Sequence, residues 1–265
     1  MPPSDAPVYF ISDSHLGLLI RDGVEREKNL ISFLREIAAN GKALFIVGDL
    51  FDFWIEYKSA IRPEYFPVLH ELRKLAESGV EIHYMAGNHD FLLGPFLEKK
   101  IGIIIHLDHF TTVLQSKKIH LFHGDGLIKR DVGYRILKKI LRNPFNQRFF
   151  KFLHPDIGVP LGSFCSGSSR KVTSKFITEG ILEEYRNHAR EYLRSGDDIV
   201  IFAHTHRPEI KHYNGKTYCN SGEWIRKYTF AKLESGAMTL WQYFPGGEIQ
   251  EIPEAEFLNT GSRES

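Results

Sequence analysis

The feature of this sequence that most constrains its fold is a series of short apolar runs that each end in a small polar cluster. Val8–Ile11, Leu44–Val47 and Ile199–Phe202 are rich in β-branched and aromatic residues, and an amphipathic pattern over residues 24–39 separates the first two runs. Strand, helix and strand at this spacing predict a parallel sheet with crossover helices. The polar clusters are Asp13-Ser14-His15, Gly48-Asp49-Leu50-Phe51-Asp52, Gly87-Asn88-His89-Asp90, His123-Gly124-Asp125 and His204-Thr205-His206.

The polar clusters carry side chains of the kinds that bind divalent metals. In an open α/β sheet, functional groups gather beyond the carboxyl ends of the strands. Carboxylate and amide oxygens together with imidazole nitrogens suit Mn²⁺, Fe²⁺ or Zn²⁺. Each cluster alone could be a helix cap or a polar turn, but their joint occurrence in this order favours a metal site. We therefore predict a dinuclear centre with the ligands Asp13, His15, Asp49, Asn88, His123, His204 and His206.

The local sequence suggests how individual ligands act. Asp49 suits a bridging position because its carboxylate has two oxygens and the glycine before it permits a sharp turn. Asp13 and His15 are two residues apart, so an extended segment would present both on one side to a single ion. His204 and His206 repeat this spacing. The remaining histidines lack such a context and are predicted to be structural or on the surface: His70, His83, His106, His109, His120, His154, His188 and His212.

The rest of the chain continues the alternation and then changes to hairpins. The further predicted elements are a helix near 63–77, a strand at Val80–Ala86, two strands within 110–122 joined at Ser116-Lys117-Lys118, a long helix near 171–194 and a strand at Ile199–Ala203. Asn214-Gly215 is a strong hairpin signal, and further strands run to about residue 244. The C-terminal third is therefore predicted to be antiparallel and to form a second sheet packed on the first.

Composition and charge limit the possible classes of protein. A chain of 265 residues with 42% hydrophobic and 25% charged side chains is typical of globular proteins, and we predict one domain over residues 1–265. The two cysteines, Cys165 and Cys219, indicate a reducing compartment. The N-terminal segment lacks the features of a secretory signal, and no apolar run approaches the roughly 20 residues that span a bilayer. We expect a cytoplasmic protein that is at most peripheral to a membrane.

Basic residues are concentrated in one segment. Residues 129–171 hold ten Lys or Arg and two Asp, although the formal net charge of the chain is only +1. This concentration indicates an anionic partner. Within it, Tyr134, Leu137 and Leu141 recur at helical spacing between basic residues, so the segment could cover acyl chains and attract a pyrophosphate or an anionic membrane surface. The alternative is that its helices simply pack on the core, with Lys and Arg reaching water.

The order of the motifs resembles the calcineurin-like metallophosphoesterase superfamily, and the matching segments are Asp13-x-His15, Gly48-Asp49-x-x-Asp52, Gly87-Asn88-His89-Asp90, His123 and His204-x-His206. The resemblance runs from residue 8 to about residue 207. It implies an α/β fold, namely a four-layer αββα metallophosphoesterase sandwich. The ligand sets that it implies are Asp13, His15, Asp49 and His206 for one ion, and Asp49, Asn88, His123 and His204 for the other.

The resemblance also implies a catalytic pair. His89 would act as a cationic imidazole that stabilises charge on the phosphoryl group or protonates the leaving oxygen. Asp52 would hold the tautomer of His89 and favour its charged form, and the alternative is that Asp52 only caps a helix. The implied cofactors are two divalent metal ions, with Mn²⁺ as the first choice and Fe²⁺ or Zn²⁺ as alternatives.

Longer segments resemble one branch of this superfamily, the UDP-2,3-diacylglucosamine diphosphatases of lipid A biosynthesis; they are residues 48–55, 90–94, 123–125 and 204–208. These enzymes cleave a pyrophosphate and release UMP and 2,3-diacylglucosamine 1-phosphate. The branch carries a helical lid after its His-Gly-Asp motif, and residues 129–168 occupy that position here. The substrate-binding residues predicted in this region are Asp131 and Tyr134, which match a motif of the branch, and Ser168, Arg170 and Lys171, which are of phosphate-binding type.

The sequence departs from the better-known members of this branch at one pair of positions. Those members have Arg after the motif Asn and Glu at the position of Asp52, whereas this chain has His89 and Asp52, as in the wider superfamily. The alternatives are a phosphodiesterase or nucleotide pyrophosphatase with a water-soluble substrate, and a non-catalytic scaffold with the same fold. A nuclease is disfavoured because the basic residues are confined to one insertion. The expected partners are a nucleotide-linked glycolipid and the inner-membrane surface, with no nucleic acid.

Overall fold

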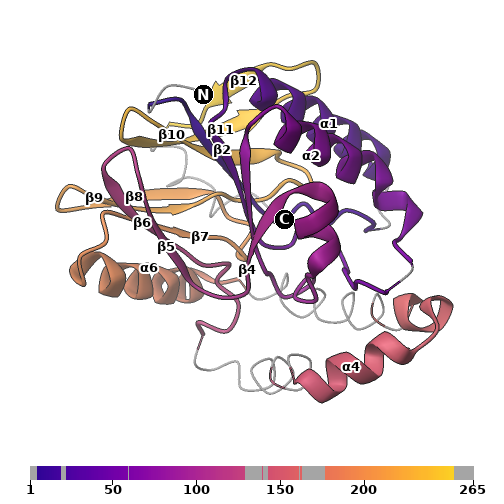
Figure 1. Cartoon of the computed structure of the whole chain (residues 1–265). Coiled ribbons are helices and arrows are strands. Elements are labelled where there is room, and N and C mark those ends of the chain that lie inside the picture. Colours follow the sequence, from indigo (N-terminus) through magenta and orange to yellow (C-terminus); the bar gives the residue numbers. More distant parts are fainter. Residues whose placement is uncertain are drawn as a thin grey trace.

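Two β-sheets pack face to face at the centre of the protein, and helices cover their outer faces (Figure 1). The computed structural model describes residues 5–253 apart from residues 19–21, 59, 129–138, 140–142, 161 and 163–176. The larger sheet has seven strands in the order β12-β11-β10-β1-β2-β3-β4, and the smaller sheet has five in the order β5-β6-β7-β9-β8.

Parallel strands form one part of the larger sheet, as the alternation in the sequence predicts. They are β1 (Val8–Ile11), β2 (Ala43–Val47), β3 (Glu81–Met85) and β4 (Ile103–His106). β1 and β2 are buried along their whole length. Their sequences are continuously apolar because both faces of a parallel sheet are covered. β4 is absent from the predicted elements.

The helices α1 (Gly23–Asn40) and α2 (Phe66–Glu77) pack against each other on the outer face of the larger sheet (Figure 1). Apolar residues of α1 recur at helical spacing and are buried: Leu30, Phe33, Leu34 and Ile37. A short 3₁₀ turn (Pro63–Tyr65) leads into α2, so the predicted helix near 63–77 is divided into two pieces. A π-helical turn, η2 (Leu97–Ile101), packs beside α2.

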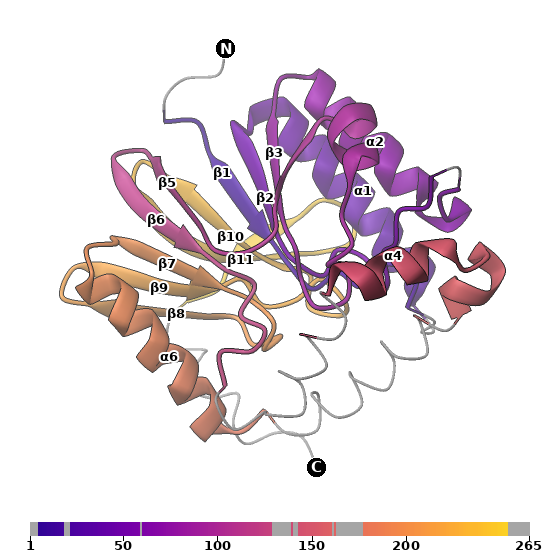
Figure 2. The same cartoon turned by 60° about the horizontal axis from the view of Figure 1, so that its bottom comes forward.

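The smaller sheet combines both strand directions and is covered by α6 (Glu179–Arg194) (Figure 2). Its strands are β5 (Phe110–Leu114), β6 (Lys117–Leu121), β7 (Ile199–Phe202), β8 (Glu209–Tyr213) and β9 (Lys216–Asn220). The turn between β5 and β6 lies at Gln115-Ser116, where both residues have positive φ. The predicted turn at 116–118 is therefore wrong, since its two lysines pair with β5.

The prediction of a separate antiparallel sheet in the C-terminal third is wrong in part. The strands β10 (Thr229–Glu234), β11 (Ala237–Tyr243) and β12 (Ile249–Glu251) extend the larger sheet, because β10 pairs antiparallel with β1. β7 and β9 pair in parallel within the smaller sheet. A local hydrophobic pattern identifies a strand but does not say which sheet edge it will join, and this explains the error.

The layers can be followed from three buried clusters of apolar residues. One lies between the larger sheet and α1 and α2, and it includes Leu30, Phe33 and Leu72. A second lies between the sheets and includes Phe10 and Leu121. A third fills the space between the smaller sheet and α6. Helix, sheet, sheet and helix therefore form the four-layer αββα sandwich that was predicted.

The predicted lid over residues 129–168 contains the helix α4 (Pro144–Phe152) (Figures 1 and 2). Asn143 begins this helix, since its side chain accepts a hydrogen bond from the N–H of Phe145 at 2.9 Å. Phe150 packs against Phe53, with ring centroids 6.1 Å apart. Much of the lid lies outside the described residues, so its extent stays a prediction. None of the described helices combines the length and apolar character needed to cross a bilayer.

Candidate metal centre

The predicted ligands meet at the carboxyl ends of five strands, which come from both sheets. Asp13 follows β1, Asp49 follows β2 and Asn88 follows β3, all in the larger sheet. His123 follows β6 and His204 follows β7 in the smaller sheet. Because the sheets face each other, loops that are distant in sequence converge at one end of the sandwich.

The backbone of these loops is strained at the ligands themselves. Positive φ angles occur at Asp13 (50°), His15 (43°), Asp49 (54°), His204 (67°) and His206 (56°). A residue with a side chain pays about 1–3 kcal/mol for such a conformation, which persists where the surrounding structure holds it. The expectation of extended Asp-x-His and His-x-His segments is therefore wrong. Each motif turns sharply, but Asp13 and His15 still face the same ligand group, as predicted, whereas His204 and His206 face different ones.

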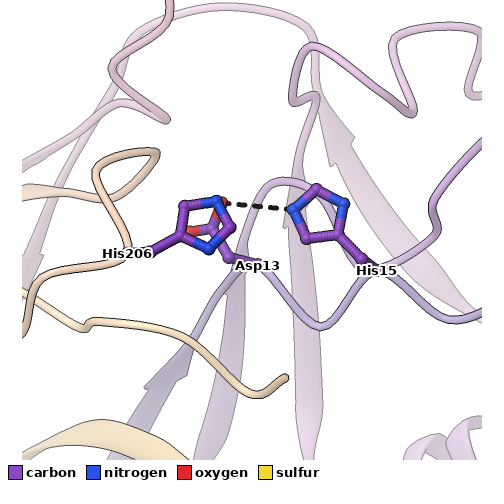
Figure 3. Close-up of side chains that lie close together, drawn as sticks. All are labelled: Asp13, His15 and His206. Carbon is purple, nitrogen blue, oxygen red and sulfur yellow. Dashed lines mark ion pairs between the residues drawn. The ribbon is translucent and has the colours of Figure 1, made fainter. Parts of the chain in front are cut away.

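The first ligand group consists of Asp13, His15 and His206 (Figure 3). Nε2 of His206 lies 3.4 Å from Oδ1 of Asp13, and Nε2 of His15 lies 3.8 Å from the same oxygen. The two imidazole rings are nearly parallel, with centroids 5.3 Å apart. The ligand atoms of this group all lie within 4.8 Å of one another. Loops after β1 and β7 thus present one carboxylate and two imidazoles to a common point.

The second ligand group consists of Asp49, His123 and His204, with Asn88 beside it. Nε2 of His123 lies 3.4 Å from Oδ2 of Asp49, 3.1 Å from Oδ1 of Asn88 and 3.3 Å from Nδ1 of His204. Nδ1 of His123 donates to the carbonyl of Val47 at 2.8 Å, which orients the ring so that Nε2 faces the group.

Asp49 lies between the two groups. Its Oδ2 is 3.4 Å from Nε2 of His123 and 3.7 Å from Nε2 of His15. Its Oδ1 instead accepts the main-chain N–H of His89 at 2.9 Å. Only Oδ2 of Asp49 therefore faces both groups, and the role of Asp49 as a bridging ligand stays a prediction.

Neighbouring histidines set the pKa values of the two carboxyl groups. Burial alone raises the pKa of Asp13, but the surrounding imidazoles, His206 first among them, outweigh burial and lower that pKa to about 2. The same balance holds the pKa of Asp49 well below its usual range, with His123 as the main lowering influence. Both groups are therefore ionised at neutral pH and can act as metal ligands.

The histidines of the centre differ in charge. Burial lowers the pKa values of His204 and His206 to about 4, so both rings are neutral at pH 7. Burial acts in the same direction on His123, but the Asp49 carboxylate overcomes it and raises the pKa of His123 to about 10. With no cation bound, His123 therefore holds a proton on Nε2. That proton lies close to Oδ1 of Asn88, Nδ1 of His204 and Oδ2 of Asp49, which are the atoms that a cation would contact.

The donor set fits divalent metal ions. Oδ1 of Asp13 and both ring nitrogens of His15 are buried without a hydrogen-bond partner, which is costly unless another group satisfies them. Carboxylate oxygens, an amide oxygen and imidazole nitrogens together suit Mn²⁺, Fe²⁺ or Zn²⁺. Asp49 lies close to a histidine of each group, so the two groups are adjacent, as a two-metal site requires.

His89 and Asp52 lie beside the centre and contact each other. Nδ1 of His89 donates to the main-chain carbonyl of Asp52 at 3.0 Å, while the Asp52 carboxylate is 3.8 Å from that nitrogen and 3.6 Å from Nδ1 of His15. Burial lowers the pKa of His89 to about 4. At neutral pH the lowered pKa leaves the ring of His89 neutral in the absence of a ligand, and its catalytic pairing with Asp52 stays a prediction.

Comparison with known sequences agrees with this geometry. Residues 6–208 match the family described as calcineurin-like phosphoesterases, and this span contains every predicted ligand. The chain belongs to the calcineurin-like phosphoesterase family. Membership implies divalent metal ions at the centre.

Named relatives of this phosphoesterase align over most of its length. The UDP-2,3-diacylglucosamine hydrolase of Porphyromonas gingivalis is 30% identical over 254 residues, which cover 88% of this chain and 96% of the relative. The enzyme of the same name from Neisseria meningitidis is 32% identical over 224 residues, which cover 84% and 91%. Among solved structures, Entamoeba histolytica Vps29 complexed with zinc is 15% identical with a TM-score of 0.45, over 93% of this chain and 98% of that chain.

Two features of the phosphoesterase site were missed in the sequence. Asp90 was placed in a cluster without a role, yet it is fully buried and binds the loop of Asp49. An apolar cluster that includes Phe53 and Leu92 adjoins the centre, and the apolar residues after Asp52 were its only signal. The predicted substrate-binding residues lie outside the described part of the chain: Asp131, Tyr134, Ser168, Arg170 and Lys171.

Proposed function

We propose that this phosphoesterase cleaves the pyrophosphate of UDP-2,3-diacylglucosamine and releases UMP and 2,3-diacylglucosamine 1-phosphate, a step of lipid A biosynthesis. The observation that carries the proposal is that Asp13, His15 and His206 hold their ligand atoms within 4.8 Å of one another, and that Asp49, His123 and His204 do so beside them. Two-metal sites of this kind serve in-line displacement at phosphorus. The substrate follows from the relatives that are named for it and that cover 84–88% of this chain.

The proposed ligand sets are Asp13, His15, Asp49 and His206 for one ion, and Asp49, Asn88, His123 and His204 for the other. Divalent cations, with Mn²⁺ proposed ahead of Fe²⁺ and Zn²⁺, stabilise the charge that develops on phosphoryl oxygens and lower the pKa of water. The protein's own residues prepare the site. The Val47 carbonyl sets the orientation of His123, and burial keeps His204 and His206 neutral, with lone pairs available.

His89 is the proposed catalytic group, with Asp52 as its support. The hydrogen bond to the Asp52 carbonyl places the proton of the neutral ring on Nδ1 and leaves the lone pair on Nε2. Nε2 lies 4.0 Å from Oδ2 of Asp49, so it faces the centre. A diphosphate brings negative charge that favours the protonated ring. His89 can thus accept a proton when water is activated and donate a hydrogen bond to a phosphoryl oxygen.

The apolar cluster beside the centre offers a surface for acyl chains. Phe53, Ile55 and Leu92 are covered by Phe150 of α4, so acyl chains would reach them by entering between α4 and the body of the protein. Phe53 directly follows Asp52, so this surface begins next to the catalytic pair. Each methylene removed from water contributes about 0.8 kcal/mol. Even partial burial of two acyl chains therefore favours the diacylated substrate over its deacylated form, and the predicted lid over residues 129–168 would enlarge this surface.

We extend the proposal to peripheral association with the cytoplasmic face of the inner membrane. Phe145 and Phe152 of α4 are 82% and 81% exposed, and Ile157 nearby is 60% exposed. The helix carries Arg148 and no acidic residue. Exposed aromatic side chains with adjacent positive charge favour an anionic lipid surface.

Sedimentation with anionic vesicles tests this association. The double variant Phe145→Ser/Phe152→Ser should bind vesicles several-fold more weakly than the unmodified protein. Phe66→Ser is a matched control, because Phe66 is 66% exposed on α2 and is not part of α4. Equal loss in both variants, or no vesicle binding by the unmodified protein, would contradict a membrane surface at α4.

The main test compares UMP release from UDP-2,3-diacylglucosamine and from the deacylated UDP-sugar in the presence of Mn²⁺. We expect kcat/KM to be at least about tenfold higher for the acylated substrate, because burial of a few methylenes already supplies that factor. Equal rates would leave a nucleotide pyrophosphatase or phosphodiesterase with a water-soluble substrate. No turnover of either substrate with Mn²⁺, Fe²⁺ or Zn²⁺ would favour the non-catalytic scaffold.

A further inference from the structure

Asp90 is a buried carboxylate that the proposed reaction does not use, and it accepts hydrogen bonds from four groups. Its Oδ1 accepts the N–H groups of Gly87 at 2.9 Å and of Asp49 at 3.2 Å. Its Oδ2 accepts the N–H of Phe51 at 3.3 Å and the hydroxyl of Tyr84. Asp90 and Tyr84 are both fully buried. Both oxygens of the carboxylate therefore accept hydrogen bonds from the protein.

The three main-chain groups that Asp90 binds belong to the two loops that carry Asp49 and Asn88. Gly48 and Asp49 both have positive φ, at 84° and 54°, which is costly for the aspartate. The loop of Asn88 also contacts the side chain of Asp49, since the N–H of His89 donates to Oδ1 of Asp49 at 2.9 Å. The main-chain N–H of Asp49 and one of its carboxylate oxygens are thus held by the same neighbouring loop.

We propose that Asp90, supported by Tyr84, is a positioning residue that holds Asp49 in the conformation in which Oδ2 faces both ligand groups. The inference rests on the proposed metal centre and deepens it. Tyr84 belongs to β3 and lies in the hydrophobic core between the larger sheet and its helices, so it anchors the carboxylate to rigid structure. Without Asp90, the strained backbone of Asp49 can relax, and Oδ2 then turns away from one group.

The chemistry of its neighbours explains why this position requires a carboxylate. A carboxylate has only acceptors, and all four partners of Asp90 donate to it. In Asp90→Asn, one oxygen becomes an NH₂ group that faces at least one main-chain N–H. The hydroxyl of Tyr84 can rotate and accept, but a main-chain N–H cannot. The variant therefore loses at least one hydrogen bond to the loops while it keeps the volume of the side chain.

Calorimetric titration with Mn²⁺ of the full-length protein, first freed of metal by a chelator, tests the proposal. Asp90→Asn should raise the dissociation constant for Mn²⁺ by about 10- to 100-fold, the range found when groups that orient metal ligands are lost. Tyr84→Phe keeps the carboxylate and should raise it by a smaller factor, about threefold. Activity of both variants should recover as the Mn²⁺ concentration is raised.

Two matched variants separate positioning from general stability. Asp197→Asn alters a buried carboxylate that pairs with Lys118 at 3.0 Å, and Tyr9→Phe removes a buried tyrosine hydroxyl that donates to Asn40 at 3.1 Å. Both lie away from the ligand loops, so their Mn²⁺ affinity should stay within about twofold of the unmodified protein. Urea unfolding of all four variants shows which of them fold.

The outcomes separate this inference from the proposed function. If the unmodified protein binds no Mn²⁺, Fe²⁺ or Zn²⁺, the metal centre itself is wrong. If the unmodified protein binds Mn²⁺ and Asp90→Asn binds it equally well, only the role of Asp90 is overturned, even where the variant is less stable. If Asp90→Asn does not fold, Tyr84→Phe decides: weaker Mn²⁺ binding than in Tyr9→Phe supports the proposal, and equal binding overturns it.

Discussion

Buried histidines occur in two regions of the molecule, and their surroundings differ. In the metal centre, His15, His123 and His206 face the carboxylates of Asp13 or Asp49 at 3.4–3.8 Å. A second set, which we call the stacked histidines, lies on and beside the strands β3, β4, β5 and β6 and comprises His83, His106, His109 and His120. His83 and His120 are also buried, whereas His106 is partly buried and His109 is exposed, so burial alone does not distinguish the two regions.

The stacked histidines pair with one another and with aromatic rings. Nδ1 of His83 lies 2.9 Å from Nε2 of His106, and Nδ1 of His109 lies 3.0 Å from Nε2 of His120. His106 stacks on Phe110 with centroids 3.7 Å apart, and His120 stacks similarly on Tyr192 at 4.0 Å. No candidate metal group in the described part of the chain includes any of them.

The difference shows what makes a buried histidine a metal ligand. The ring itself is the same in both regions, and burial lowers the pKa values of His106 and His120 to about 4, as it does for His204 and His206. Carboxylates also lie beside the stacked histidines, but singly: Glu81 is 2.6 Å from His83, Asp108 is 3.7 Å from His109 and Asp197 is 3.8 Å from His120. In the centre, two buried carboxylates, Asp13 and Asp49, lie among several imidazoles and supply the negative charge that a pair of cations requires. The stacked histidines serve as polarisable packing groups whose ring nitrogens contact each other and these single carboxylates.

The largest expected effect comes from removing the shared charge of the centre. In Asp49→Asn, kcat/KM for UDP-2,3-diacylglucosamine should fall by about 10³ or more, because several kcal/mol of transition-state stabilisation depends on the bound cations. Release of UMP in excess Mn²⁺ measures this. Asp197→Asn is the matched control, since Asp197 is buried 3.8 Å from His120 among the stacked histidines. A comparable loss of activity in the control would break the distinction between the two regions.

Metal removal should affect stability through the centre alone. At a Mn²⁺ concentration about 100 times the dissociation constant, one bound ion raises the free energy of unfolding by about 2.7 kcal/mol. Urea unfolding with and without a chelator measures the increment. The increase in the free energy of unfolding that Mn²⁺ causes should be smaller in His206→Asn and unchanged in His106→Phe. An increment that disappears in His106→Phe would link the stacked histidines to metal binding and contradict our assignment.

Metal affinity should rise with pH, because a cation must displace a proton from His123. The Asp49 carboxylate raises the pKa of His123 to about 10, so the ring is protonated throughout the neutral range and releases one proton when an ion binds. The apparent affinity of this site for Mn²⁺ should therefore increase about tenfold per pH unit near neutrality. Titrations at several pH values test this, and His120→Phe should keep the same slope. A flat pH dependence would count against His123 as a ligand.

The free energy of unfolding of the metal-free protein should decrease as the pH falls from about 6.5 to about 4, because histidines in both regions have lowered pKa values. The pKa values of His106, His120, His204 and His206 are lowered to about 4 by burial. Over this interval the unfolded chain binds more protons than the folded one, so the free energy of unfolding decreases with decreasing pH. Urea unfolding in chelator should show a shallower decline in His106→Phe/His120→Phe. An unchanged slope would mean that these rings titrate normally in the folded protein.

The smallest effect is expected for a single stacked histidine. His106→Phe preserves the aromatic contact with Phe110 but leaves Nδ1 of His83 without its partner, which should cost about 1–3 kcal/mol of stability. The kcat/KM for UMP release should stay within about twofold of the unmodified enzyme. Thermal unfolding and the activity assay together measure both quantities. A large loss of activity at unchanged stability would assign His106 a functional role.

Much of the centre was predictable because its ligands are local in sequence. Each cluster is a short segment at the end of an apolar run, and the parallel alternation places several such ends together. The same context separated the histidines of the centre from those that proved to be stacked. The left-handed backbone at Asp13 and Asp49 was not predictable, because no short motif shows which residues the surrounding loops will hold in a strained conformation.

By itself, the sequence determined which side chains can bind metal, the strands that carry them and the layered α/β class, since these follow from residue chemistry and local periodicity. Tertiary structure alone decided that β10 joins β1, that one oxygen of Asp49 faces both groups, and that Asp90 secures this arrangement from the neighbouring loop. These features arise from contacts between segments that are distant along the chain. Their free energy depends on the packing of the whole sandwich, which no local pattern records.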